Sequence, residues 1–513
     1  MRDVIVDTHS GKVEGLEKRG VLQFRGIPYA TAERFAAPRR IERWSGVRDA
    51  TRFGPIAPQP ATAAGPLGAR PGGGGEDCLV LNVFTPTGGL DGSRPVMVWI
   101  HGGGFTGGAG SVPWYDGTSL AAKGDVVVVT INYRLGALGF LHLAHRFPEL
   151  AGSGANGIRD QVMALEWVRD NVAAFGGDPA RVTIFGESAG GMSVGTLLGT
   201  PGADGLFRGA IAQSGACANV HDAASGAAVA DRFVEALGLA PDDLDGLRAA
   251  PVDAVLAAQV ATDPRAGGEV AGDRPRYGLL TFQPVVDGTV LPAPPLAAVR
   301  AGSAAGVSLV AGSTADEWNL FHAIVRARGP LDEDQVRRRL GAVVEPDRVG
   351  EVWDAYREAR PGADPDGLLC AAMTDFVFRM PAVRLAEAQS AHAPVAMYRF
   401  DYASPSFGAC HAIDVPFVFD NLDRQGVEFL LAGSDGLDAG AHRLAGRTAR
   451  AWTTMAHAGS PATDELAWPA YDTTDRATCV LDREPSVLAD PEGGLRRLWD
   501  ELAPVPGSGA VVD

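Results

Sequence analysis

A serine set between glycines, directly after a hydrophobic strand, constrains this chain more than any other feature. Residues 185–191 read Phe-Gly-Glu-Ser-Ala-Gly-Gly; the strand-like segment Arg181–Ile184 precedes them and a run of small residues follows. A strand–turn–helix context of this kind is what a Gly-x-Ser-x-Gly nucleophile turn requires. Glycine permits the sharp backbone turn, and the N-terminus of the following helix favours negative charge. The sequence therefore predicts that Ser188 is a nucleophile.

The rest of the chain alternates strands with helices. Helical spacing runs over Asp160–Ala174, whereas short hydrophobic runs bounded by Gly or Asp are typical of buried strands. The expected strands are Val96–Ile100, Val126–Asn132, Val182–Phe185, Ala210–Gln213, Val307–Gly312 and Val395–Phe400. This alternation predicts an α/β fold with a mostly parallel sheet covered by helices on both faces. We expect one large domain over residues 1–513, with helical excursions over the active site at about 219–275 and 331–392.

The net charge and the cysteine content limit which partners and which cellular compartment we expect. The net charge of −17 argues against nucleic acid or an anionic membrane as a main partner. The strongest hydrophobic runs have the length of a strand, far below the roughly 18 residues of a membrane span, and the N-terminus does not resemble a signal peptide. The five cysteines form no CxxC pair, which favours a reducing compartment. We therefore expect a cytoplasmic protein; the oligomeric state stays open.

A glycine-rich loop supplies the second chemical motif. His101-Gly-Gly-Gly-Phe105 follows the strand Val96–Ile100. Such a loop offers backbone N–H groups to the oxyanion of a tetrahedral intermediate, together with the N–H after the nucleophile. The predicted oxyanion donors are therefore Gly103, Gly104 and Ala189. We interpret His101 as a residue that orients the loop, not as a base.

With these two motifs, the chain resembles the type-B carboxylesterase family, which includes the cholinesterases and the bacterial para-nitrobenzyl esterases. Matching blocks run from Gly11 to about Pro469 and include residues 24–30, 76–83, 132–140, 156–161, 175–179 and 213–215. The resemblance implies the α/β-hydrolase fold and a serine carboxylesterase that needs no cofactor and no metal. In the family, Cys78 often pairs with an upstream cysteine; no cysteine precedes it here, so that disulfide is absent.

A serine needs a histidine to take its proton, and the histidine needs an acid that fixes its tautomer. In this fold the acid and the histidine follow the serine along the chain. His411 lies in a loop after the strand at 395–400 and resembles the catalytic histidine of the family. We interpret His442 and His457 as helix residues without a catalytic role.

Two adjacent carboxylates, Asp316 and Glu317, follow the strand near Val307, where active residues of such sheets lie. The residues alone do not separate them; the resemblance assigns the role of acid to Glu317, and Asp316 remains the rival. We expect Glu187 and Asp414 to be hydrogen-bonded carboxylates beside the site, with Glu187 pointing away from the nucleophile.

Large side chains near these motifs suggest the kind of ester that is accepted. Phe105 follows the oxyanion glycines, while Leu320 and Phe321 match positions that line the site in cholinesterase-like relatives. Trp318 stands where the family commonly has glycine, and it lines either the pocket or the core. We expect a hydrophobic pocket for short to medium acyl or aryl esters. Residues 54–77 lack the aromatic residue of cholinesterases, which argues against a preference for choline esters.

Two other functions remain as alternatives. A biosynthetic acyltransferase, cyclase or lyase would use the same residues, and an assay that follows both hydrolysis and transfer to an added alcohol would distinguish it. A non-catalytic binding protein of this family would have lost the nucleophile, whereas this chain has a candidate for every member of the triad.

Overall fold

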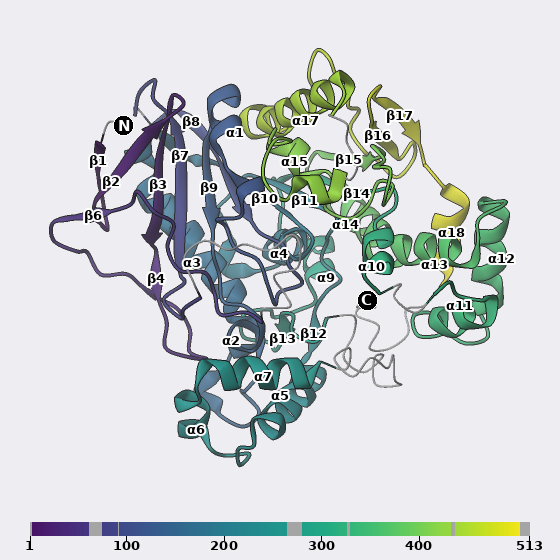
Figure 1. The fold of residues 1–513 in the computed structure, drawn as a ribbon, viewed down its shortest axis with the longest axis horizontal. Helices are drawn as coiled ribbons and strands as arrows, with labels where there is room; N and C mark the ends of the chain where they lie inside the picture. Colours follow the sequence, from purple (N-terminus) through teal and green to yellow (C-terminus); the bar gives the residue numbers. More distant parts are fainter. Residues whose placement is uncertain are drawn as a thin grey trace.

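The computed structural model describes residues 3–60, 74–90, 92–263, 280–325, 329–431 and 437–502. Its centre is a thirteen-stranded sheet in the order β1-β2-β3-β7-β9-β8-β10-β11-β14-β15-β16-β17, with β6 paired to β2 (Figure 1). The strands from β9 to β16 run parallel, and the antiparallel strands lie at the two edges. The mostly parallel sheet predicted from the sequence is confirmed.

All six predicted strands are present: β8, β10 and β11 are longer than predicted, β15 has the predicted bounds, β9 is shorter, and β14 is shifted toward the C-terminus. The parallel strands are β9 (Val127–Ile131), β8 (Arg94–Ile100), β10 (Gly177–Glu187), β11 (Gly209–Gln213), β14 (Ser308–Thr314), β15 (Val395–Phe400) and β16 (Ala477–Leu481). The edge strands are β1 (Asp3–Thr8), β2 (Gly11–Lys18), β3 (Val21–Pro28), β6 (Val47–Asp49), β7 (Val80–Pro86) and β17 (Ser486–Ala489). Short pairs form from β4 (Ala30–Thr31) with β5 (Arg39–Arg40) and from β12 (His221–Asp222) with β13 (Val285–Val286).

Successive strand residues point to opposite faces of the sheet, and each face has its own hydrophobic core. Val96 and Val98 belong to one cluster, which includes residues of α3 (Asn156–Asn171) and α4 (Ala189–Leu198). Met97 and Trp99 belong to the other, which includes residues of α1 (Thr118–Gly124) and α17 (Ala439–Ala458). Both faces of the sheet are therefore covered, as the predicted α/β architecture requires. The helix predicted at 160–174 begins earlier, and Val172–Phe175 form a 3-10 turn after it.

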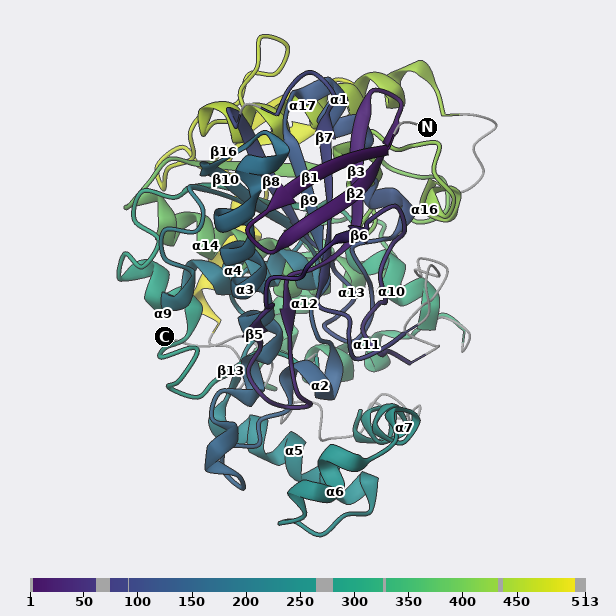
Figure 2. The same cartoon turned by 90° about the vertical axis from the view of Figure 1, so that its left-hand side faces the viewer.

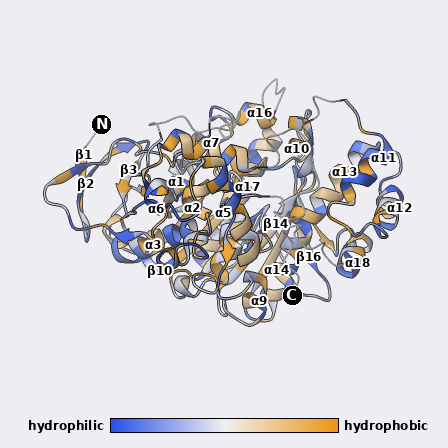
Figure 3. Ribbon diagram, turned by 90° about the horizontal axis from the view of Figure 1, so that it is seen from below, coloured by the Kyte–Doolittle hydropathy of each residue, from blue (hydrophilic) through white to orange (hydrophobic). Residues whose placement is uncertain are grey.

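Two groups of helices extend from the sheet where the sequence predicted excursions. Figures 1 and 2 both show α5 (Ala223–Leu237), α6 (Leu244–Ala249) and α7 (Val252–Thr262) together at the lower end. The second group contains α10 (Trp318–Val325), α11 (Glu333–Leu340), α12 (Val349–Ala359), α13 (Pro365–Thr374), a π-helical turn (Asp375–Arg379) and α14 (Met380–Ser390). The C-terminal helix α18 (Gly493–Glu501) lies beside this group, whose outer helix α11 carries hydrophilic colours in Figure 3.

The remaining helices are α2 (Gly136–Phe140), α9 (Pro295–Arg300), α15 (Val415–Val418) and α16 (Val427–Leu431). The stretch 264–275, predicted as part of the first excursion, lies outside the described residues. No helix in the described part of the chain is long and hydrophobic enough to cross a membrane. The organisation as one domain remains a prediction, which limited proteolysis would test.

Candidate active site

Ser188 lies in a strained turn between β10 and α4. Its backbone has φ 57° and ψ −128°, a conformation that side chains rarely adopt and that costs of order 1–3 kcal/mol. The turn fits only because its neighbours are small: a Cβ on Gly190 would lie 2.0 Å from the carbonyl oxygen of Ile100, and one on Gly186 would lie 2.6 Å from the backbone of Gly190. Ser188 is partly exposed, whereas the residues on either side of it are buried. The turn therefore presents the serine hydroxyl at the carboxyl end of the sheet.

The glycine loop after β8 lies directly against this turn. A Cβ on Gly102 would be 3.0 Å from the Cβ of Ser188. Among the described residues, the N–H groups of Gly103, Gly104 and Ala189 donate to no other residue, so all three donors are free. The three predicted oxyanion donors thus lie in the two segments next to Ser188: Gly103 and Gly104 in the glycine loop, and Ala189 at the start of α4.

His101 holds the start of this loop. Its ring stacks on Tyr133 with centroids 4.5 Å apart, and its Nδ1 lies 2.8 Å from the carbonyl oxygen of Gly102. Burial lowers the pKa of His101 to about 4. A neutral, buried imidazole that contacts the loop backbone agrees with the predicted orienting role.

His411 and Glu317 meet in the interior. Glu317 Oε2 lies 2.6 Å from His411 Nδ1, and its Oε1 accepts a hydrogen bond of 2.8 Å from the N–H of Thr314. Asp316 turns the other way and accepts from the N–H of Ala409 at 3.0 Å. The geometry therefore separates the two carboxylates that the sequence could not: Glu317 faces the imidazole, and Asp316 faces the loop that carries it.

Glu187 corrects one expectation. The sequence predicted that it points away from the nucleophile, but its Oε1 lies 3.1 Å from His411 Nε2. Glu187 therefore lies beside this ring nitrogen, and Ser188 makes no hydrogen bond to it within the described residues.

The buried carboxylates set the proton affinity of the site. Burial opposes the charged imidazolium, but Glu187 and Glu317 outweigh it and raise the pKa of His411 to about 9. Burial raises the pKa of Glu187 to about 8 and the pKa of Asp414 to about 6. The site therefore retains protons at higher pH than these groups would in water.

Asp414 is hydrogen-bonded, as predicted. It accepts from Gln213 Nε2 and from the hydroxyl of Tyr398, both at 2.9 Å. The backbone carbonyl of Gln213 in turn accepts from the N–H of Ser188 at 3.0 Å. Gln213 thus connects the nucleophile turn to the loop that carries His411.

The four predicted pocket residues lie in different surroundings. Phe105 has no exposed surface and packs on Phe140, with ring centroids 5.0 Å apart, and Leu320 is buried in the core. Phe321 is partly exposed and lies 4.9 Å from the His411 ring, with Trp318 5.0 Å behind it. Of the four, the structure brings only Phe321 into contact with His411.

A residue that the sequence reasoning missed completes these surroundings. Phe378, on the π-helical turn Asp375–Arg379, lies with its ring centroid 4.8 Å from that of His411. The only signal in the sequence was a hydrophobic pattern inside a predicted helix. Within the described ranges, no cluster of three or more His, Cys, Asp or Glu residues could hold a metal ion.

This fold, with a serine turn, a glycine loop and a His–Glu pair at the carboxyl ends of its strands, defines an α/β-hydrolase. A family model described as the carboxylesterase family matches residues 2–493. The chain is 41% identical to the para-nitrobenzyl esterase of Bacillus subtilis (strain 168), over 97% of this chain and 98% of that protein. It is 35% identical to the phenmedipham hydrolase of Pseudarthrobacter oxydans, over 94% and 96% of the two chains.

A solved structure of a Geobacillus stearothermophilus carboxylesterase at pH 6.2 superposes with a TM-score of 0.86 at 40% identity, covering 96% of this chain and 99% of that one. The chain belongs to the carboxylesterase family, and it is a carboxylic-ester hydrolase. The resemblance and the enzyme class predicted from the sequence are confirmed.

Proposed function

We propose that Ser188, His411 and Glu317 form the catalytic triad and that the enzyme hydrolyses short to medium acyl or aryl esters. The contact of 2.6 Å between Glu317 and His411 Nδ1 carries this proposal. It fixes the tautomer in which Nδ1 carries the proton, so that Nε2 is the nitrogen that accepts the proton of the serine. The missing contact between Ser188 and Nε2 is compatible with the proposal, because catalytic hydrogen bonds often tighten only when substrate binds.

The proposed reaction has two halves. Ser188 Oγ attacks the ester carbonyl while His411 takes its proton, and the N–H groups of Gly103, Gly104 and Ala189 stabilise the oxyanion. His411 then gives the proton to the leaving alcohol, and the acyl group stays on Ser188. Water, activated by His411, attacks this acyl-enzyme, and the acid leaves as Ser188 recovers its proton. One oxyanion donor is worth on the order of 3 kcal/mol of transition-state stabilisation.

Replacement of the nucleophile tests the triad. Ser188→Ala should abolish turnover and leave the circular dichroism spectrum unchanged, and an organophosphonate should label only the wild type. Retention of more than a few per cent of activity in a Ser188→Ala preparation would remove Ser188 from the mechanism. With an added alcohol, the same assay separates hydrolysis from acyl transfer.

The ester range rests on Phe321, which faces His411 with a partly exposed ring and Trp318 behind it. Each buried methylene contributes about 0.8 kcal/mol, so kcat/KM should rise with acyl length until the pocket ends and then fall. A series of p-nitrophenyl esters from acetate to palmitate measures this. Phe321→Ala should move the optimum to bulkier esters; an optimum at palmitate in the wild type would contradict the proposed range.

We further propose a cytoplasmic location, with no nucleic acid among the partners. All five cysteines are buried and none of them forms a disulfide, which suits a reducing compartment, and the net charge of −17 disfavours polyanions. Activity in the cytosolic fraction of the native host would support this location, and activity in the periplasmic or secreted fraction would contradict it.

A further inference from the structure

His411 is held by two aromatic rings besides its carboxylates. Phe321 on α10 and Phe378 on the π-helical turn lie 4.9 and 4.8 Å from the imidazole centroid, and they stack on each other at 6.0 Å. Phe321 is partly exposed, whereas Phe378 is only 2% exposed. Phe378 therefore contacts the imidazole from the protein interior.

The turn that carries Phe378 is unusual. A π-helix adds one residue per turn, costs hydrogen-bond geometry and occurs often at functional sites. All five residues Asp375–Arg379 are buried. Phe376 and Phe378 point to different neighbours, because Phe376 contacts Trp499 of α18 at 5.6 Å while Phe378 contacts His411.

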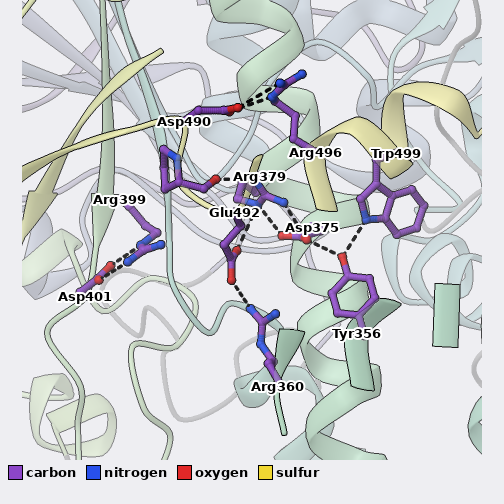
Figure 4. A network of polar contacts seen from close by, with 11 residues as sticks. Tyr356, Arg360, Asp375, Arg379, Arg399, Asp401, Asp490, Glu492, Arg496 and Trp499 are labelled. Carbon is purple, nitrogen blue, oxygen red and sulfur yellow. Dashed lines mark hydrogen bonds and ion pairs between the residues drawn. The ribbon is translucent and has the colours of Figure 1, made fainter. Parts of the chain in front are cut away.

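A buried charge network fixes the base of this turn (Figure 4). Arg379 spans the turn and donates to both carboxylate oxygens of Asp375, at 2.5 and 2.8 Å. Asp375 also accepts from the hydroxyl of Tyr356 on α12, which in turn accepts from Trp499 Nε1 at 2.7 Å. Glu492, before α18, accepts from Arg360 at 2.7 Å and lies 3.7 Å from Arg379.

We propose that the π-helical turn Asp375–Arg379 is a positioning element for His411: the Asp375–Arg379 pair sets the geometry of the turn, and Phe378 holds the imidazole at the angle that proton transfer needs. Glu317 and Glu187 contact the two nitrogens of the imidazole, and the ring can still tilt about the line that joins these two contacts; the two phenyl rings restrict this tilt. The proposal rests on His411 being the base in the proposed function. It makes Phe378 and Asp375 positioning residues, because both are buried and act through the imidazole of His411.

Phe376 provides the matched control for Phe378, since both are buried phenylalanines of the same turn. We would compare Phe378→Leu with Phe376→Leu, using p-nitrophenyl acetate and counting active sites by phosphonate titration, so that misfolded protein does not contribute. A displaced catalytic group costs up to about 100-fold in rate, so Phe378→Leu should lower kcat per titrated site about tenfold or more with KM nearly unchanged. Phe376→Leu should leave kcat per site within about twofold of wild type even where its melting temperature falls.

The charge pair has its own control. Asp375→Asn should also lower kcat per titrated site, whereas Asp490→Asn should not, because Asp490 pairs with Arg496 in the same bidentate way without contacting the turn. Phe378→Met serves if Phe378→Leu does not fold. Equal kcat per titrated site in the Phe376 and Phe378 variants, or an unchanged kcat in Asp375→Asn, would overturn the proposal. The triad itself would still stand in that case, because titration reports an intact Ser188.

Discussion

At the scale of single residues, the two nitrogens of His411 lie between carboxylates, with Glu317 at Nδ1 and Glu187 at Nε2. A base acts only when it is neutral, so activity should appear as the pH rises through the pKa that governs His411. Because Glu187 and Glu317 raise that pKa to about 9, the acidic limb of the kcat/KM profile should lie above the usual histidine value of about 6.5. For coupled groups, the limb reports the cluster as a whole.

Removing the Glu187 charge should therefore move this limb. Glu187→Gln eliminates the largest single charge interaction that raises the pKa of His411, so the midpoint of the limb should shift to lower pH. A kcat/KM profile from pH 5 to 10 measures it. Asp316→Asn is the control, because that carboxylate faces Ala409 and not the imidazole. An unchanged midpoint in Glu187→Gln would contradict a charged Glu187 beside His411 in the free enzyme, whose ionisations kcat/KM reports.

Substitutions of the neighbouring residues Asp316 and Glu317 test which of the two carboxylates is the acid of the triad. Glu317→Gln removes the acceptor of His411 Nδ1 and should lower kcat by roughly 10⁴-fold, the loss seen when a triad loses its orienting acid. Asp316→Asn keeps an acceptor for the N–H of Ala409 and should cost far less. Steady-state kinetics on both variants decide the matter, and a greater loss in Asp316→Asn would move the role of acid by one residue.

The sequence could predict those site residues that lie in contiguous motifs. Ser188, with its glycines, and the loop from His101 to Phe105 are readable because the chemistry needs their spacing along the chain. The contacts of Glu187 and of Phe378 with His411 both depend on how segments far apart in the sequence pack together. No local pattern records either of these, so only the structure reveals them.

At the scale of elements, replacing glycine by alanine should have opposite effects on stability in two helices. Gly190 in α4 lies where a Cβ would be 2.0 Å from the carbonyl oxygen of Ile100, so Gly190→Ala should displace the nucleophile turn and lower both activity and melting temperature. Gly446 in α17 has nothing within 4 Å of such a Cβ. There, alanine should stabilise the helix by about 0.5–1 kcal/mol. Thermal melts and kcat of both variants measure this, and a tolerated Gly190→Ala would contradict the close packing.

Secondary structure was predictable where hydrophobic runs are short and buried on both sides, as in β8 and β10. The edge strand β17 escaped prediction, because it is exposed at all four of its residues and carries no hydrophobic alternation. The π-helical turn escaped as well, since one extra residue in a helix leaves the hydrophobic pattern almost unchanged. In both cases tertiary pairing decides the structure.

At the scale of the whole molecule, the sheet brings together residues that are far apart in the sequence, because Ser188, Glu317 and His411 all follow the carboxyl ends of parallel strands. The protein also carries a net charge of −17, so its long-range electric field is negative. Such a field attracts cationic substrates over long distances, and salt screens the attraction. The Debye length falls to about 3 Å at 1 M salt, so little steering remains there.

The salt dependence of kcat/KM separates two possible causes of a preference for a choline ester. Field steering would favour butyrylcholine over its neutral isostere, 3,3-dimethylbutyl butyrate, at low salt only. An aromatic cage, worth about 2 kcal/mol when desolvated, would act at short range and persist in salt. Residues 54–77 contain no Trp, Tyr or Phe, so we expect the two kcat/KM values to converge between 0.01 and 1 M NaCl, where the Debye length drops from about 30 to about 3 Å. A ratio above about tenfold that survives at 1 M, equivalent to about 1.4 kcal/mol, would mean that aromatic side chains elsewhere in the chain form a cation site.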